Sequence, residues 1–241
     1  MPKAVQACVA EAIGTFALCF IGAGAICMTT KMGADGPGLL GVAIAHGLIL
    51  AIAVSATMNV SGGHVNPAVT LAMLSTGRIG LGEAIRYVIS QLVGATIAGI
   101  FVYLIFRGLQ TGDNLSVVEA AGLGTPAFGS RQMTMGSAVL VESVLTFLLV
   151  FAVFGTAVDP RAPKIGGFGI GLTIACDILV GGPLTGAAMN PARTFGPGIV
   201  AWGAGVLPMF WEQHLAYWVG PVLGGCLAGI VYDSFIIEKN P

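Results

Sequence analysis

Long apolar stretches separated by short polar turns make up most of the chain. Five of them, at residues 5–29, 87–106, 135–157, 165–181 and 214–236, each fit one membrane-spanning helix, because about 20 residues cross the hydrocarbon layer. The first stretch resembles a secretion signal, but it contains Glu11 and is longer than a signal core. It therefore predicts a retained first helix.

The segment between Asp35 and Arg78 has a different pattern. It runs for 42 residues without Asp, Glu, Lys or Arg, which is too long for one span and too short for two with a loop. A Gly-Gly pair interrupts it, and Asn66 followed by Pro67 is typical of a helix start. We expect one full helix at about 38–59, an irregular loop, and a half-length helix at 66–76. Irregular backbone at this depth must line a cavity or be buried in protein.

The same arrangement occurs twice. Asn-Pro-Ala stands at 66–68 and again at 190–192, and the motif around Glu11 returns around Glu142. The chain is thus expected to be a single channel domain, 1–241, built from repeats at about 5–107 and 135–236 joined by an outer loop at 108–134. Three crossings in each half would insert the second half upside down, giving an inverted repeat.

Composition supports a membrane protein. Hydrophobic residues make up 56% of the chain and charged residues 9%, against roughly 25% charged in soluble domains. The net charge of −1 provides no basic face, so nucleic acid is not an expected partner. The five cysteines form no CxxC pair, so we expect buried free thiols and no metal site or cofactor.

The few basic residues predict an orientation. Placing the N-terminus in the cytoplasm puts six of them inside and three outside, which follows the positive-inside tendency. The six are Lys3, Arg78, Arg86, Arg161, Lys164 and Lys239, and the three are Lys31, Arg107 and Arg131. Both termini are therefore expected to be cytoplasmic.

Two half helices that meet head to head would place positive partial charge at the bilayer centre. Asn66 and Asn190 could each donate a hydrogen bond there, and backbone carbonyls of the preceding loops would line the path. Those carbonyls belong to Gly62, Gly63, His64, Gly186, Ala188 and Met189. Such a path suits small neutral polar molecules in single file and opposes cations. Nothing in it supplies a nucleophile or a metal cage, so we do not expect an enzyme.

At these loops the chain resembles the aquaporin family. The segments SGGHVNPAVT (61–70) and GPLTGAAMNPARTFGP (182–197) are similar to its two signature loops, and the likeness extends from 10–16 to 217–229. The resemblance implies an all-α membrane protein with six transmembrane helices and two re-entrant half helices. It also implies a homotetramer with a pore in each subunit.

The resemblance assigns roles to particular residues. The two signature boxes are Asn66, Pro67, Ala68, Asn190, Pro191 and Ala192. The selectivity filter is His46, Ile178, Ala187 and Arg193. Glu11 and Glu142 are implied to be structural acceptors that hold the two loops.

This filter is similar to that of the tonoplast-type branch, which implies a channel for water and also for ammonia in the cell membrane or a vacuole-like membrane. Glycerol is a second candidate solute, since the filter lacks a Phe, although Thr194 and the Tyr217-Trp218 pair favour the water type. An inverted-repeat secondary transporter is an alternative class. An intramembrane hydrolase using Ser61 and His64 is a weaker one, because no third residue would orient the histidine.

Two further residues leave alternatives open. Asp177 departs from the uncharged residue usual in tonoplast-type relatives. It is either a carboxylate that snorkels to the interface or bonds to a loop, or a neighbour of His46 or Arg193 that raises the pKa of His46 and makes permeation pH-dependent. Asn114-Leu115-Ser116 forms a glycosylation sequon in the outer loop.

Overall fold

The computed structural model describes residues 1–129, 133–208 and 211–238. Two of the basic residues used for orientation, Arg131 and Lys239, lie outside these ranges. The long helices are α1 (Lys3–Met32), α2 (Gly38–Ser61), α4 (Leu81–Phe106), α6 (Met135–Val153), α7 (Phe168–Thr185) and α9 (Trp211–Phe235). The shorter elements are η1 (Gly33–Asp35), α3 (Pro67–Ser75), α5 (Val117–Ala120), η2 (Gly122–Gly124), η3 (Phe154–Val158) and α8 (Pro191–Gly203).

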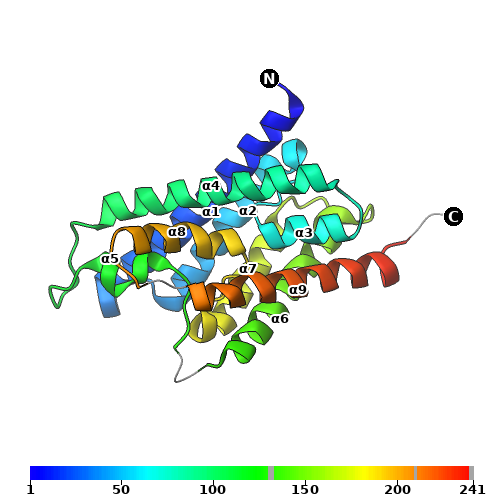
Figure 1. The fold of residues 1–241 in the computed structure, drawn as a ribbon. Coiled ribbons are helices and arrows are strands. Elements are labelled where there is room, and N and C mark those ends of the chain that lie inside the picture. The colour runs from blue at the N-terminus through cyan, green and yellow to red at the C-terminus, as the bar shows by residue number, and fades with distance from the viewer. Residues whose placement is uncertain (130–132, 209–210, 239–241) are drawn as a thin grey trace.

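Six helices within the described residues are long and apolar enough to cross a membrane, which confirms the all-α, six-span prediction. The two short helices α3 and α8 lie between α4 and α9 and run from the middle of the bundle toward opposite ends (Figure 1). The helix α4 begins at Leu81 rather than at 87. Glu83 and Arg86 interrupt the apolar run there, but they do not interrupt the helix, whose N-cap is Gly80.

Two local features have no counterpart in the hydrophobic pattern. The last turn of α6 widens into a π-helix, η3. The outer loop contains α5, η2 and an isolated antiparallel bridge between Gln110 and Ser116. Asn114, in the turn of that bridge, is exposed and has a positive φ of 59°. The sequon is therefore on the surface.

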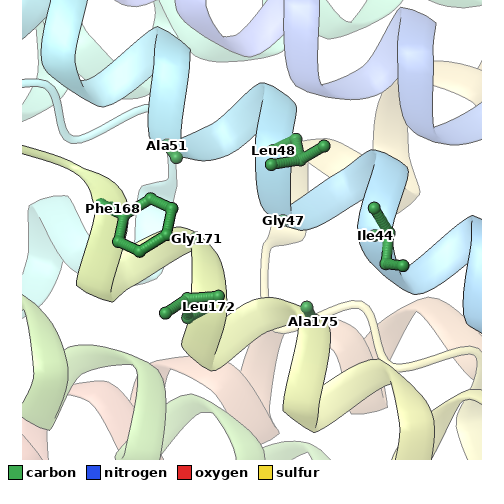
Figure 2. A pocket seen from close by; sticks show the side chains of 8 residues that line it. All are labelled: Ile44, Gly47, Leu48, Ala51, Phe168, Gly171, Leu172 and Ala175. Atoms are coloured by element: carbon green, nitrogen blue, oxygen red, sulfur yellow. The ribbon is translucent and has the colours of Figure 1, made fainter.

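Glycines allow the long helices to cross closely. Figure 2 shows α2 and α7 crossing at Gly47 and Gly171. A Cβ on Gly47 would lie 2.6 Å from the carbonyl oxygen of Gly171, so neither position has space for a side chain. Ile44 and Leu172 beside this crossing are about half exposed, as suits a surface that faces lipid or another subunit.

The cysteine prediction is only partly correct. Cys19 and Cys27 are buried, but Cys8 and Cys226 are half-buried and Cys176 is exposed. The error has a physical cause, because lipid-facing and core-facing positions of a spanning helix are equally apolar. An apolar run therefore does not reveal which face of the helix a thiol occupies.

At one end of the bundle, α9 holds two connecting segments in place. Arg78, which follows α3, forms an ion pair of 2.6 Å with Asp233. In the segment after η3, Arg161 donates to Asp159 through Nη2 at 2.8 Å and to the Ile236 carbonyl at 3.0 Å. These hydrogen bonds from Arg161 hold the pKa of Asp159 well below its usual range.

Candidate functional site: a polar passage between two half helices

Each half helix begins at the Asn-Pro pair that the sequence predicts as its start. Asn66 has an extended backbone, and its Oδ1 accepts the Ala68 N–H at 2.8 Å. Asn190 does the same for Ala192 at 3.0 Å and for Arg193 at 3.2 Å. A proline at the first helical position of each follows the usual preference, because no amide hydrogen is lost there.

The two asparagines also join the two loops to each other. The Nδ2 of Asn66 donates to the Met189 carbonyl at 2.9 Å, and the Nδ2 of Asn190 donates to the Val65 carbonyl at 2.9 Å. An amide nitrogen carries two hydrogens, so each asparagine keeps one for another acceptor. The Met189 carbonyl, expected to line the path, accepts from Asn66 and so has less capacity to accept from a permeating molecule. The sequence pattern does not predict this bond between the loops.

The first loop is tied to Glu11 of α1, which is fully buried. Its Oε1 accepts from the Ser61 hydroxyl at 2.6 Å and from the His64 N–H at 2.9 Å. Its Oε2 accepts from the Val65 N–H and from the Gln91 amide, both at 2.7 Å. One carboxyl thereby fixes a loop in which Gly62, Gly63 and Val65 all have positive φ.

Glu142 of α6 holds the second loop in a similar way. Its Oε1 accepts from the Thr185 hydroxyl at 2.6 Å and from the Ala188 N–H at 3.0 Å. Its Oε2 accepts the Met189 N–H at 2.7 Å. Tyr217 adds a 2.6 Å bond to the Thr185 carbonyl. This is the geometry that a loop-anchoring role for both glutamates requires.

Three cavities lie beside the two loops, and we name them outer, central and inner after the orientation expected from the sequence. The outer one, about 320 Å³, is lined by His46, Ile178 and Gly186 among others. The inner one, also about 320 Å³, reaches Gly62, Gly63 and His64. Between them a cavity of about 10 Å³ contains both asparagines, which is room for about one water molecule.

Most of the residues that line the central cavity are apolar. Six of them come from the full-length helices α2, α6 and α7, namely Leu50, Val54, Leu149, Val153, Ile170 and Ile174. The polar side chains in the lining are Asn66, Asn190 and His64. A small polar molecule in the cavity therefore has few hydrogen-bond partners, all of them near the two loops.

His46 lines the outer cavity and is hydrogen-bonded to Arg193. His46 Nδ1 lies 2.8 Å from the Val42 carbonyl, so that nitrogen carries the proton and Nε2 is an acceptor. Arg193 donates its Nε–H to that Nε2 at 3.3 Å. Ile178 and Ala187, the other two expected filter residues, are buried at 4% and 5% exposure.

Arg193 has N–H donors that its hydrogen bond to His46 does not use. Its residue is 3% exposed, yet Nη1 has no hydrogen-bond partner within the described part of the chain. A buried guanidinium N–H without a partner is costly. It is thus available to an acceptor that enters the passage.

Gly22 of α1 is a site residue that the sequence did not reveal. A Cβ at this position would lie 2.9 Å from His46 Cε1 and closer still to two other ring atoms. The absence of a side chain at Gly22 therefore leaves space for the imidazole. Only the approach of α1 to α2 makes this visible.

Asp177 does not join the filter. Its side chain is 4% exposed and Oδ2 has no hydrogen-bond partner, and among the described residues it forms no hydrogen bond or ion pair with His46 or Arg193. The hypothesis that Asp177 lies against the filter is not supported by this placement.

Comparisons with known proteins agree with this architecture. The major intrinsic protein family model matches residues 1–232. Among the similar proteins are aquaporin TIP4-4 of Zea mays, 45% identical over 98% of this chain and 88% of its own length, and probable aquaporin TIP3-2 of Arabidopsis thaliana, 43% identical over 99% and 86%. The solved aquaglyceroporin of Plasmodium falciparum superposes with a TM-score of 0.84 at 24% identity, covering 97% of each chain, which shows the fold. The chain is thus a multi-pass membrane protein that belongs to the major intrinsic protein family, whose members are channels rather than enzymes.

Proposed function

We propose that this protein is a passive pore that conducts water in single file. The observation that carries the proposal is the central cavity, which has room for about one water molecule and contains both Asn66 and Asn190. A water oxygen there can accept from both amides. Its own hydrogens then point away from the centre toward the two ends of the passage.

This orientation also supports exclusion of ions and protons. A water that accepts two bonds from fixed donors cannot accept a proton from its neighbour, so a chain of proton transfers is interrupted. The N-termini of α3 and α8 add positive partial charge at the same point. Arg193 adds a full positive charge at the outer end, and both features oppose cations.

Ammonia is a second candidate solute. The outer constriction combines the guanidinium of Arg193 with the imidazole of His46 and two apolar side chains. Ammonia could accept a hydrogen bond from Arg193 and pass along the apolar side chains. The names of the similar plant proteins agree with a water-type pore. Glycerol is the alternative solute, and the same vesicle assay compares all three.

We further propose the assembly and the location. Residues 5–107 and 135–236 are taken as an inverted repeat joined by 108–134, since Glu11 and Glu142 anchor their loops through matching atoms. The protein is proposed to be a homotetramer in the tonoplast or cell membrane, with cytoplasmic termini. The half-exposed apolar residues beside the α2–α7 crossing would face lipid or a neighbouring subunit.

Stopped-flow light scattering on proteoliposomes tests the function. An osmotic step with an impermeant solute should shrink the vesicles faster than empty liposomes, with an activation energy below that of lipid alone. Ala187→Trp fills the outer constriction and should abolish the increase while leaving helix content unchanged. Shrinkage no faster than that of empty liposomes, with folded and inserted protein, would overturn the proposal.

A further inference from the structure

A chain of buried polar side chains supports the first half helix and ends at the pore. Gln91 of α4 donates through Nε2 to Glu11 Oε2 at 2.7 Å and to Thr70 Oγ1 at 2.9 Å. Thr70 Oγ1 lies 3.1 Å from His64 Nδ1. Gln91 and Thr70 are fully buried and His64 is 7% exposed, so bulk water does not compete for these bonds.

The directions of these bonds follow from the groups available. A carboxylate only accepts, and Glu11 Oε2 already accepts the Val65 N–H. Gln91 must therefore meet it with the NH₂ group. Rotating the Gln91 amide by half a turn would place its oxygen against the carboxylate of Glu11. In the present orientation Gln91 Oε1 has no hydrogen-bond partner, so no bond at that end of the amide favours the rotated form.

The second hydrogen of the Gln91 amide then sets the direction at Thr70. Because Thr70 Oγ1 accepts from Gln91, its own proton is free to be donated, and His64 Nδ1 is the side-chain atom in reach. A ring nitrogen that accepts carries no proton. If Nδ1 donated instead, the Thr70 hydroxyl would accept twice and its buried proton would have no side-chain acceptor among the described residues. The arrangement that satisfies every group therefore has neutral His64 with its proton on Nε2.

His64 lines both the central and the inner cavity. We propose that Gln91 and Thr70 are positioning residues that hold His64 in the Nε2–H form, so that it presents a fixed donor to oxygen atoms in the inner half of the pore. The role in permeation rests on the proposed function, whereas the proton position does not. The outer histidine, His46, carries its proton on Nδ1, so the two pore histidines are held in opposite forms.

The second half helix has no counterpart of the hydrogen bonds between threonine and histidine. Thr194 stands four residues after Asn190 as Thr70 stands four after Asn66, and Ala188 takes the place of His64. The Thr194 hydroxyl is buried and has no hydrogen-bond partner among the described residues. A threonine at this position is therefore not sufficient for a hydrogen-bonded network of this kind. Thr194 offers a matched control for Thr70.

The experiment is ¹⁵N solid-state NMR of histidine-labelled protein in lipid bilayers, with His64 assigned by its loss in His64→Ala. We expect a single Nε2–H resonance pattern from His64 in the unmodified chain, whereas His46 should give the Nδ1–H pattern. Thr70→Val removes the donor to Nδ1 and should shift the ratio of the two proton positions about fivefold, which corresponds to the loss of one ordinary hydrogen bond. Thr194→Val should leave the His64 signals unchanged.

An Nδ1–H signal from His64 in the unmodified chain would overturn the proposal, and so would the same His64 spectrum in Thr70→Val. If Thr70→Val fails to fold, Gln91→Met removes the amide that directs Thr70 and should give the same shift. Water permeability measured in the same bilayers separates the two proposals. A pore without the expected His64 form contradicts this inference alone, and the expected form without water flow contradicts the proposed function alone.

Discussion

His46 accepts the Nε–H of Arg193 on the one ring nitrogen that its bond to Val42 leaves free. The imidazole therefore fixes the guanidinium in the outer constriction. A displacement of the ring would therefore weaken the contact that holds Arg193 in place.

Gly22→Ala tests this coupling. The added methyl would lie within 3 Å of the His46 ring, so the ring must move and the Arg193 contact must lengthen. We expect water permeability to fall severalfold in the stopped-flow assay. Gly24→Ala is the matched control, because its Cβ would approach nothing closer than Phe106 at 4.0 Å. Equal permeability in the two variants would contradict the prediction.

Glu11→Gln should destabilise the protein. An amide NH₂ in place of one carboxyl oxygen would face backbone N–H groups of the first loop, leaving buried donors unsatisfied at a cost of about 3 kcal/mol. The apparent melting temperature in detergent and the water permeability should both fall. Glu119→Gln, at an exposed position on α5, should change neither. A melting temperature equal to that control would argue against the anchoring role.

Asp177→Asn should raise the melting temperature and leave water permeability unchanged. Its carboxyl is buried and Oδ2 has no hydrogen-bond partner among the described residues, so a charged form would be costly there. A neutral amide of the same size removes that cost. A loss of permeability in this variant would instead show that Asp177 acts on the pore.

Asp159→Asn should lower stability in a pH-dependent way. Hydrogen bonds from Arg161 lower the pKa of Asp159 in the folded state, so its contribution is fully present above the unfolded value of about 4 and is lost as pH falls below it. The melting-temperature gap between the unmodified protein and Asp159→Asn should be constant from pH 5 to 7. It should narrow below about pH 4. A gap that changes between pH 5 and 7 would assign the effect to another group.

The sequence predicts much of this fold because its signals are local. Charge-free runs mark the spans, and Asn66-Pro67 and Asn190-Pro191 mark the starts of the half helices. Those starts depend on capping and on proline, which act over one turn. The filter residues came from resemblance and spacing, and the structure brings His46 and Arg193 within hydrogen-bond distance.

The features that could not be predicted from the sequence are those that depend on how the helices face each other. The space at Gly22, the bond from Asn66 to Met189 and the placement of Asp177 away from the filter all require the relative rotation of two helices. In a lipid-exposed bundle, hydropathy does not report that rotation, since both faces are apolar. The exposed Cys176 was misjudged for the same reason.

The exchange between the two loops also bears on how the protein is made. The acceptor for Asn66 is Met189, 123 residues further along the chain. At a synthesis rate of 5–20 residues per second, the ribosome needs roughly 6–25 seconds to deliver it. Until then the first half helix sits in the membrane with a donor that has no permanent acceptor. A nascent chain that has been inserted only through α4 therefore cannot hold a finished passage, and the pore closes around its centre only after translation has reached the second asparagine.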